Sequence, residues 1–175
     1  MQFILFNEKE KQQYSNEIYE ITRICDKDFV PPLSARSSTL QKNFSKVSDG
    51  GSIDEYFVQM MEQKVLGVIE DGVLLGFVSF KENYCDGTID ENTVPNIYVS
   101  TVMLSPQARG RRLTACAYEH LFNSVYKDYN VYTRTWSTNG AHIRILEKFG
   151  FRELKRIKDD RGENIDTVYF EKLRK

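Results

Sequence analysis

The chain has 175 residues, 41% hydrophobic and 28% charged, with a formal net charge of -1 at pH 7. These values are ordinary for one globular domain with a substantial core. A balanced charge gives no global field toward nucleic acid, and no apolar run approaches the ~20 residues that cross a bilayer. Neither a nucleic acid nor a membrane is therefore expected as a partner, and any anion site must be local.

The cysteines point to a reducing compartment. Cys25, Cys85 and Cys116 lie far apart without the spacing of metal ligands, which favours free thiols, a cytoplasmic location and no metal site. The apolar run at the start of the chain is too short for a signal peptide, and acidic residues follow it too soon.

The first part of the chain favours helices. A short strand at 3–6 is followed by Asn7 and Glu10, whose spacing predicts a capping box at the start of a helix reaching Cys25. The prolines at 31–32 end regular structure. The polar stretch 34–48 carries Leu40 and Phe44 at a spacing that allows one helical face.

The rest of the chain alternates strands and helices. Asp71-Gly72 is a strong hairpin signal between two apolar runs, and 84–94 is a polar, acidic loop. The expected elements in order are a helix at 53–63, strands at 65–70, 73–80 and 96–104, a helix at 111–126, a strand at 131–135, a helix at 139–149, and strands at 151–157 and 165–170. This order predicts a single α/β or α+β domain with a mixed sheet.

The segment 97–113 is the most informative part of the sequence. An extended apolar run stops at Pro106, passes through a short loop containing Gly110, and enters a helix. Free backbone N–H groups at a helix N-terminus are suited to a pyrophosphate. Helix N-termini disfavour cations, so Arg109, Arg111 and Arg112 at this place are expected to need an anion. Arg134, Arg144, Lys148 and Lys155 continue the basic cluster, and such residues are most often solvated.

Two motifs carry a resemblance to a family. Residues 102–112, Val-Met-Leu-Ser-Pro-Gln-Ala-Arg-Gly-Arg-Arg, resemble the acetyl-coenzyme A motif of the GCN5-related N-acetyltransferases (GNAT family). Residues 136–151, with Asn139 opening a helix that ends in Glu-Lys-Phe-Gly-Phe, look like the same family's second motif. The two motifs stand in the family's order, and the resemblance extends over roughly residues 65–170.

The resemblance implies a fold and a cofactor site. The fold is a twisted mixed sheet flanked by helices and splayed near 101–104 at the cofactor-binding strand, with an acetyl-coenzyme A core at 53–175 and a helical acceptor-side segment at 1–52. The cosubstrate implied is acetyl-coenzyme A. The residues that the resemblance assigns to its binding are Val102, Met103, Leu104, Gln107, Arg109, Gly110, Arg111, Arg112, Leu113, Thr114, Asn139 and His142.

Two positions depart from the family pattern. Arg112 stands where the family usually has Gly or Ala, and an outward side chain would add favourable charge there, whereas an inward one would obstruct the phosphates. Leu146 stands at the position of the family's frequent tyrosine acid, which protonates the departing thiolate. A thiol of pKa ~8.5 leaves without a dedicated acid, so the loss lowers the expected rate without excluding acetyl transfer.

Other residues are candidates for the proton transfers. Glu82, Asp90 and Glu91 lie in or beside the acidic loop, where the family often supplies a base through a water; the alternative is solvated loop charge. Tyr98 is a second candidate and otherwise a core aromatic. His142 is a third, on the helix that should flank the coenzyme, and otherwise a packing residue. Side chains alternate between the two faces of a strand, so Tyr98 is expected to share one face with Ser100 and Val102. The other face is expected to carry Ile97, Val99, Thr101 and Met103.

Two further sequence features bear on the site. Cys116 is expected in the core, on a helical face with Leu113, Ala117 and Leu121, which leaves direct transfer as the better mechanism than a covalent acyl-enzyme. Residues 25–34 have the look of a subfamily signature to which no substrate can be assigned.

The expected function is direct transfer of an acetyl group from acetyl-coenzyme A to an amine of a small molecule or peptide. Acidic residues beside the pocket mildly favour a cationic acceptor. A homodimer is possible, as dimers are common in proteins that the chain resembles. The alternatives are a non-catalytic acyl-coenzyme A sensor, which the missing tyrosine allows, and a nucleotide-binding module of another class. The second lacks support because the chain has neither a Walker loop nor a Gly-x-Gly-x-x-Gly motif.

Overall fold

The computed structural model describes residues 1–44, 51–90 and 93–174, and its framework is a seven-stranded sheet. The strand order is β1-β2-β3-β4-β5-β7-β6, and of its neighbouring pairs only β4 and β5 run parallel. The strands are β1 Gln2–Leu5, β2 Lys64–Glu70, β3 Val73–Glu82, β4 Asn96–Leu104, β5 Asn130–Trp136, β6 Arg152–Ile157 and β7 Thr167–Lys172. The predicted mixed sheet flanked by helices is therefore confirmed.

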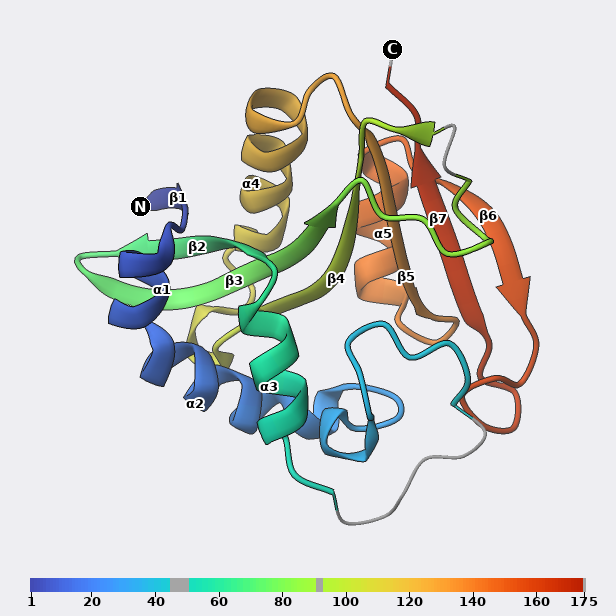
Figure 1. Cartoon of the computed structure of the whole chain (residues 1–175), viewed down its shortest axis with the longest axis horizontal. Helices are drawn as coiled ribbons and strands as arrows, with labels where there is room; N and C mark the ends of the chain where they lie inside the picture. Colours follow the sequence, from blue (N-terminus) through green and yellow to red (C-terminus); the bar gives the residue numbers. More distant parts are fainter. Residues whose placement is uncertain (45–50, 91–92, 175) are drawn as a thin grey trace.

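The helices cover both faces of this sheet (Figure 1). They are α1 Glu8–Gln13, α2 Ser15–Cys25, α3 Asp54–Met61, α4 Leu113–His120 and α5 Gly140–Lys148. One apolar core lies between the sheet and α4 and α5, and contains Val99, Tyr118 and Leu146. A second core lies between the sheet and α2 and α3, and contains Met103. The N-terminal segment and the α4–α5 pair thus occupy opposite faces.

Local signals in the sequence account for several element boundaries. The predicted capping box is present, with Glu10 N donating to Asn7 Oδ1 and Asn7 N donating to the Glu10 carboxylate. Asp71 and Gly72 both have positive φ, 51° and 79°, as a tight turn between β2 and β3 requires. The expected single first helix is instead two helices, α1 and α2, which meet at Tyr14.

Other expected elements were wrong in part. The helix expected at 111–126 starts at Leu113 and continues beyond His120 as a π-helical segment, Leu121–Val125. The helix allowed at 34–48 is absent from residues 36–44, and 45–48 lie outside the described residues. Cys116 is exposed rather than in the core, because Leu113, Ala117 and Leu121 bury a face of the helix that excludes it.

A β-bulge at Ser100 overturns the predicted faces of β4. Ser79 pairs with Thr101 and Phe80 pairs with Val99, so Ser100 is an extra residue in its strand. Strict alternation is lost at this point. Val99 lies in the core on the α4–α5 side, whereas the Thr101 hydroxyl bonds Tyr56 on the opposite side, 2.7 Å away. The expectation that Val99 and Thr101 share a face was therefore wrong.

Beyond the bulge, β4 and β5 separate. Their pairing runs from Asn96 with Asn130 to Val99 with Thr133 and then stops. The Thr133 hydroxyl donates to the Val99 carbonyl at 2.9 Å beside this last pair. Figure 1 shows β4 and β5 lying side by side at one end and diverging toward the other. The splay predicted for the cofactor-binding strand is present and leaves the backbone of 100–104 facing a gap rather than β5.

Candidate active site

A cavity of about 350 Å³ fills the gap between β4 and β5. Its walls come from residues 99–104 of β4, 133–136 of β5, the start of α5, Thr114 of α4 and the end of the N-terminal helical segment. Because α5 and the N-terminal segment cover opposite faces of the sheet, the cavity is open to groups from both faces.

Seven of the predicted cofactor residues line this cavity. They are Val102, Met103, Leu104, Arg109, Thr114, Asn139 and His142. Gln107, Gly110, Arg111 and Arg112 lie on the exposed loop outside the cavity lining, and the Leu113 side chain is buried in the core beneath α4. The structure thus brings the two sequence motifs together at one place.

The loop before α4 has the backbone conformation of an anion-binding turn. Gly110 and Arg112 both have positive φ, 76° and 60°, and Arg112 is the N-cap of α4. Within the described chain, the backbone N–H groups of 110–115 donate to no other backbone group. A row of unsatisfied N–H groups at a helix start is suited to phosphate oxygens.

Two of the three loop arginines already have carboxylate partners. Arg109 contacts Asp28 at 2.6 Å, and Arg111 contacts both oxygens of Glu70 at 2.8 and 2.9 Å. The anion expected for these arginines is thus a carboxylate of the protein itself for two of them, supplied by residues that lie far away in sequence. Among the described residues, Arg112 has no ion-pair partner, and its side chain is exposed, as tolerance of a bulky residue at this position requires.

The start of α5 holds two polar side chains at the cavity. Asn139 caps the helix by accepting from His142 N, and its amide donates to Thr135 Oγ1 at 3.0 Å. His142 Nε2 lies 2.7 Å from the hydroxyl of Tyr118, a fully buried residue of α4. Burial lowers the pKa of His142 to about 4, so its imidazole is neutral at pH 7.

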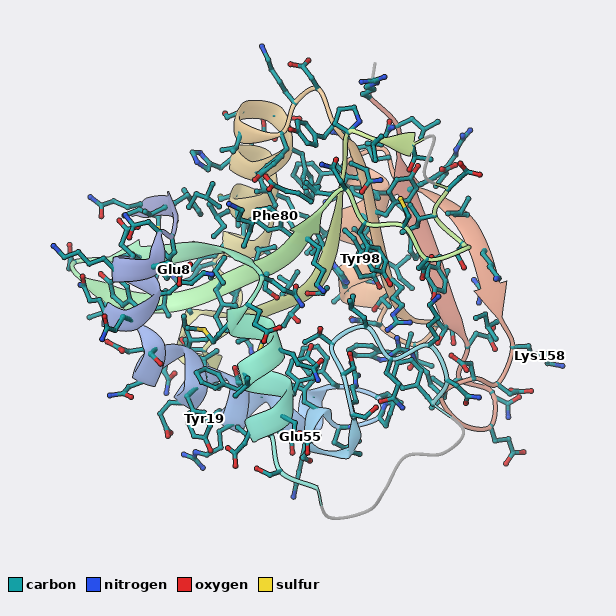
Figure 2. The ribbon with its side chains drawn as sticks, viewed as in Figure 1. Glu8, Tyr19, Glu55, Phe80, Tyr98 and Lys158 are labelled. Atoms are coloured by element: carbon teal, nitrogen blue, oxygen red, sulfur yellow. The ribbon has the colours of Figure 1, made fainter. Side chains whose placement is uncertain are left out.

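The other two catalytic candidates lie away from the cavity. Tyr98, labelled in Figure 2, lies inside the molecule. It packs in a small cluster with Tyr84 and Tyr132, and burial raises its pKa. Glu82, at the far end of β3, accepts a hydrogen bond from Tyr126 at 2.6 Å. Asp90 does not line the cavity either, and Glu91 lies outside the described residues.

Leu146 is fully buried. One turn earlier on the same helix, His142 lines the cavity, as do Ala141 and Ile145, but Leu146 does not. The position of the family's tyrosine thus contributes to the core in this chain.

The N-terminal face of the cavity contains groups that sequence reasoning did not place at the site. Cys25, Asp28 and Phe29 come from the segment 25–34, and Arg134 and Trp136 come from β5. Burial raises the pKa of the Cys25 thiol. The signal for Cys25, Asp28 and Phe29 was the unusual segment 25–34 itself.

Neither a metal centre nor a membrane span is found in the part of the chain that the structure describes. Its His, Cys, Asp and Glu side chains form no group of three or more that would hold a metal ion. None of its helices is long and apolar enough to cross a bilayer.

Comparison with known proteins places this geometry in a family. Residues 18–151, more than half of the chain, match the sequence profile of the Acetyltransferase (GNAT) family. The chain therefore belongs to the GNAT family, as the two motifs predicted. Among curated proteins no sequence matches significantly.

Solved structures share the fold across almost the whole chain. Aminoglycoside 6'-acetyltransferase type Ii has a TM-score of 0.67 at 14% identity, with 99% of this chain and 97% of that chain covered. Ribosomal-protein-alanine N-acetyltransferase from Brucella melitensis has a TM-score of 0.65 at 14% identity, with 99% of each chain covered. The Salmonella typhimurium protein yncA, solved with its cofactor acetyl-CoA, has a TM-score of 0.62 at 16% identity, covering 99% of this chain and 94% of that chain.

Proposed function

We propose that this protein is an acetyl-coenzyme A-dependent N-acetyltransferase that transfers the acetyl group directly to an amine of a small molecule or peptide. The observation that carries the proposal is the cavity in the splayed sheet, where residues of both family motifs meet. The free thiols of Cys25, Cys85 and Cys116 fit a cytoplasmic enzyme.

The two ends of the site have different tasks. We assign the pyrophosphate to the loop 107–113, where N–H groups and the exposed Arg112 are free to meet it. The unpaired backbone of 101–104 offers hydrogen bonds to the amide groups of the pantetheine arm, in the manner of an added strand. Asn139 and His142 would flank that arm from α5.

The coenzyme supplies an acetyl group activated as a thioester. A free amine nitrogen attacks its carbonyl carbon and forms the amide bond, and the carbon–sulfur bond breaks so that coenzyme A leaves as its thiolate. The nitrogen gives up one proton, which balances the charge of the thiolate and yields the free thiol. The amine must first be deprotonated, which costs about 4–5 kcal/mol at pH 7 for a lysine-like amine and about 1 kcal/mol for an α-amine. Among the catalytic candidates, His142 is the one at the cavity wall, and its neutral ring, bonded to Tyr118, is placed to pass a proton.

Acetylation of an amine panel tests the proposal. The panel contains amino acids, short peptides with free α-amines, lysine-containing peptides and polyamines, and the acetylated product is measured by mass. Mass detection is preferred to thiol reagents because Cys85 and Cys116 are exposed and react with such reagents themselves. Time-dependent formation of an N-acetyl product is expected. Tight coenzyme A binding without turnover of any amine would identify a non-catalytic sensor, and preference for ATP over coenzyme A would contradict the assignment of the loop.

A further inference from the structure

Three arginines meet around one aromatic ring beside the cavity. The guanidinium carbons of Arg36, Arg134 and Arg161 lie 5.3, 5.3 and 4.3 Å from the centre of the Phe44 ring. They come from the N-terminal segment, from β5 and from the turn before β7. Like charges gathered at this distance repel one another unless something of opposite charge is near.

Within the described chain, the donors of this cluster bond to carbonyl and hydroxyl oxygens rather than to carboxylates. Arg36 donates to the carbonyls of Val30 and Pro31, and Arg161 donates to the Val30 carbonyl and to Thr167. Arg134 donates to the Tyr169 hydroxyl at 3.2 Å. None of the three forms an ion pair within 4.0 Å.

The nearest acidic groups are hydrogen-bonded to other partners and do not contact the three guanidinium groups directly. Asp26 accepts from the backbone and hydroxyl of Ser34, Asp160 accepts from Thr167, and Asp28 is paired with Arg109. Asp86 of the acidic loop accepts from the N–H groups of Thr88 and Ile89. These carboxylates keep their charge, and Asp26 and Asp160 offset part of the charge of Arg36 and Arg161 from a distance. Arg134, which lines the cavity, forms no ion pair with a described carboxylate. The cavity wall at Arg134 therefore offers an unpaired cation, opposite to the cationic acceptor that the acidic loop suggested.

Burial makes the excess charge costly. Arg36 and Arg161 are 9% and 8% exposed. Burial, together with the charge of the neighbouring arginines, lowers the pKa of Arg36 to about 10 and that of Arg161 to about 9. Both remain protonated at pH 7, and an anion brought close would recover part of the cost of holding them there.

The cluster keeps hydrogen-bonding capacity for a ligand. Nη1 of Arg36, Nη2 of Arg161 and two nitrogens of Arg134 donate to no described protein group. No described side-chain nitrogen or oxygen is both sealed from solvent and unbonded. These nitrogens therefore remain accessible to solvent. Arginines that served only to hold the loop carbonyls would not need accessible, unbonded nitrogens.

The cluster lies on the acceptor side of the sheet. Arg134 lines the cavity next to Trp136, and Trp136 packs against Phe29 of the N-terminal segment. His142 and Asn139, which we assign to the coenzyme, reach the cavity from α5 on the opposite face. A group bound by Arg134 would thus belong to the acceptor rather than to the coenzyme.

We propose that the acceptor is an amine whose molecule also carries an anionic group, a carboxylate or a phosphate, which Arg134 binds with the charge of Arg36 and Arg161 behind it. This inference rests on the proposed function, because it names the substrate class of that site. Charge-assisted bonds from a guanidinium fork to such groups are strong and directional. Polycationic amines would be disfavoured by the same charges.

The chain carries its own probe for a binding test. Trp136 is its single tryptophan and lines the cavity. Coenzyme A-saturated enzyme is titrated at constant ionic strength with 3-aminopropanoate, 3-aminopropanamide, 2-aminoethyl phosphate and 1,3-diaminopropane, and tryptophan fluorescence is followed. We expect saturable binding of one or both anionic amines, at least about tenfold tighter than that of the amide or the diamine. The two anionic probes distinguish a carboxylate from a phosphate.

Variants separate a recognition role from a folding role. Arg134→Gln should abolish the preference for the anionic probe, whereas Arg134→Lys should retain part of it because the charge stays. Arg23→Gln, on the exposed face of α2 with its partner Glu20, is the matched control and should bind like the parent. Circular dichroism and coenzyme A affinity report whether each variant is folded.

The outcomes keep the two proposals apart. Equal binding of the four probes, tighter binding of the diamine, or an anion preference that survives in Arg134→Gln would overturn the inference while leaving acetyl transfer untouched. An anion preference that depends on Arg134, in an enzyme that acetylates no amine, would support the anion site and contradict the proposed function instead.

Discussion

The Tyr118 hydroxyl and the His142 imidazole lie 2.7 Å apart between α4 and α5, and His142 also lines the cavity. Tyr118 is fully buried, so this bond fixes the imidazole ring against the core. The pair joins α4, which directly follows the first sequence motif, to α5, which lies within the second. It therefore links the stability of the domain to the geometry of the site.

His142 should make stability depend on pH. Its folded pKa of about 4 is below the ordinary value of 6.5, so between these values the unfolded chain binds more protons than the folded one. Stability should thus fall as the pH drops through this window, by about 2–3 kcal/mol between pH 7 and pH 4.5. Urea unfolding of the parent and of His142→Gln at pH 4.5 and 7 measures the effect, and the variant should lose most of the slope.

The chain's other histidine provides the control. His120 lies at the end of α4 and stacks on Phe3 at 5.8 Å. His120→Gln should keep the pH dependence of the parent. An unchanged slope in His142→Gln would show that other groups produce the acid sensitivity.

Gly110→Val should weaken coenzyme A binding by at least about tenfold while the fold persists. A β-branched residue is strained at a φ of 76°, and relaxing that strain would turn the neighbouring N–H groups. Calorimetric titration with coenzyme A measures the affinity. Gly72→Val in the β2–β3 turn, with a φ of 79° and open space around it, carries a similar strain away from the site. It should lose stability but keep its affinity, and equal affinities of both variants would mean that the loop at 110 does not bind the coenzyme.

Arg112→Gly should stabilise the fold by about 0.5–1 kcal/mol and also weaken coenzyme binding several-fold. The φ of 60° at Arg112 is unfavourable for a residue with a Cβ, which gives a physical reason for the family's glycine at this position. The variant loses the guanidinium charge of Arg112, which has no ion-pair partner among the described residues. Thermal unfolding gives the first quantity, and titration at low and high salt gives the second. Tighter binding in Arg112→Gly would mean that the side chain obstructs the phosphates.

Leu146→Tyr should not restore an acid to the site. Leu146 is 0% exposed, so the larger, polar side chain overpacks the core and costs about 1–3 kcal/mol. Unfolding in urea and product formation with the best acceptor are the two measurements. A stable variant with a higher turnover number would show that the position reaches the coenzyme after all.

Local sequence signals predicted the parts of the fold that depend on a few neighbouring residues. Asn7 with Glu10 marked the first helix, and Asp71-Gly72 marked the β2–β3 turn, because capping and tight turns need particular side chains at fixed offsets. The two motifs marked the strand–loop–helix and the later helix that form one wall of the cavity. These features depend on residues close together in sequence, so they could be predicted without knowledge of distant contacts.

The features that were missed depend on distant residues. The bulge at Ser100 exists only in relation to β3, and it reverses every side chain after it. Glu70 and Asp28 neutralise two loop arginines from positions 41 and 81 residues away in sequence. The gathering of Arg36, Arg134 and Arg161 around Phe44 likewise joins segments that no local pattern connects.

Because the pairing between β4 and β5 ends early, a molecule bound between them can complete this part of the sheet. Five residues of a central strand, 100–104, have no partner strand on that side, so the sheet is continuous there only when something else bridges the gap. A molecule bound between β4 and β5 should therefore stabilise the sheet. It should raise the melting temperature in proportion to the logarithm of its concentration above its dissociation constant. The empty domain is accordingly the less rigid form, and the inner strands should exchange their amide hydrogens faster without the coenzyme than with it.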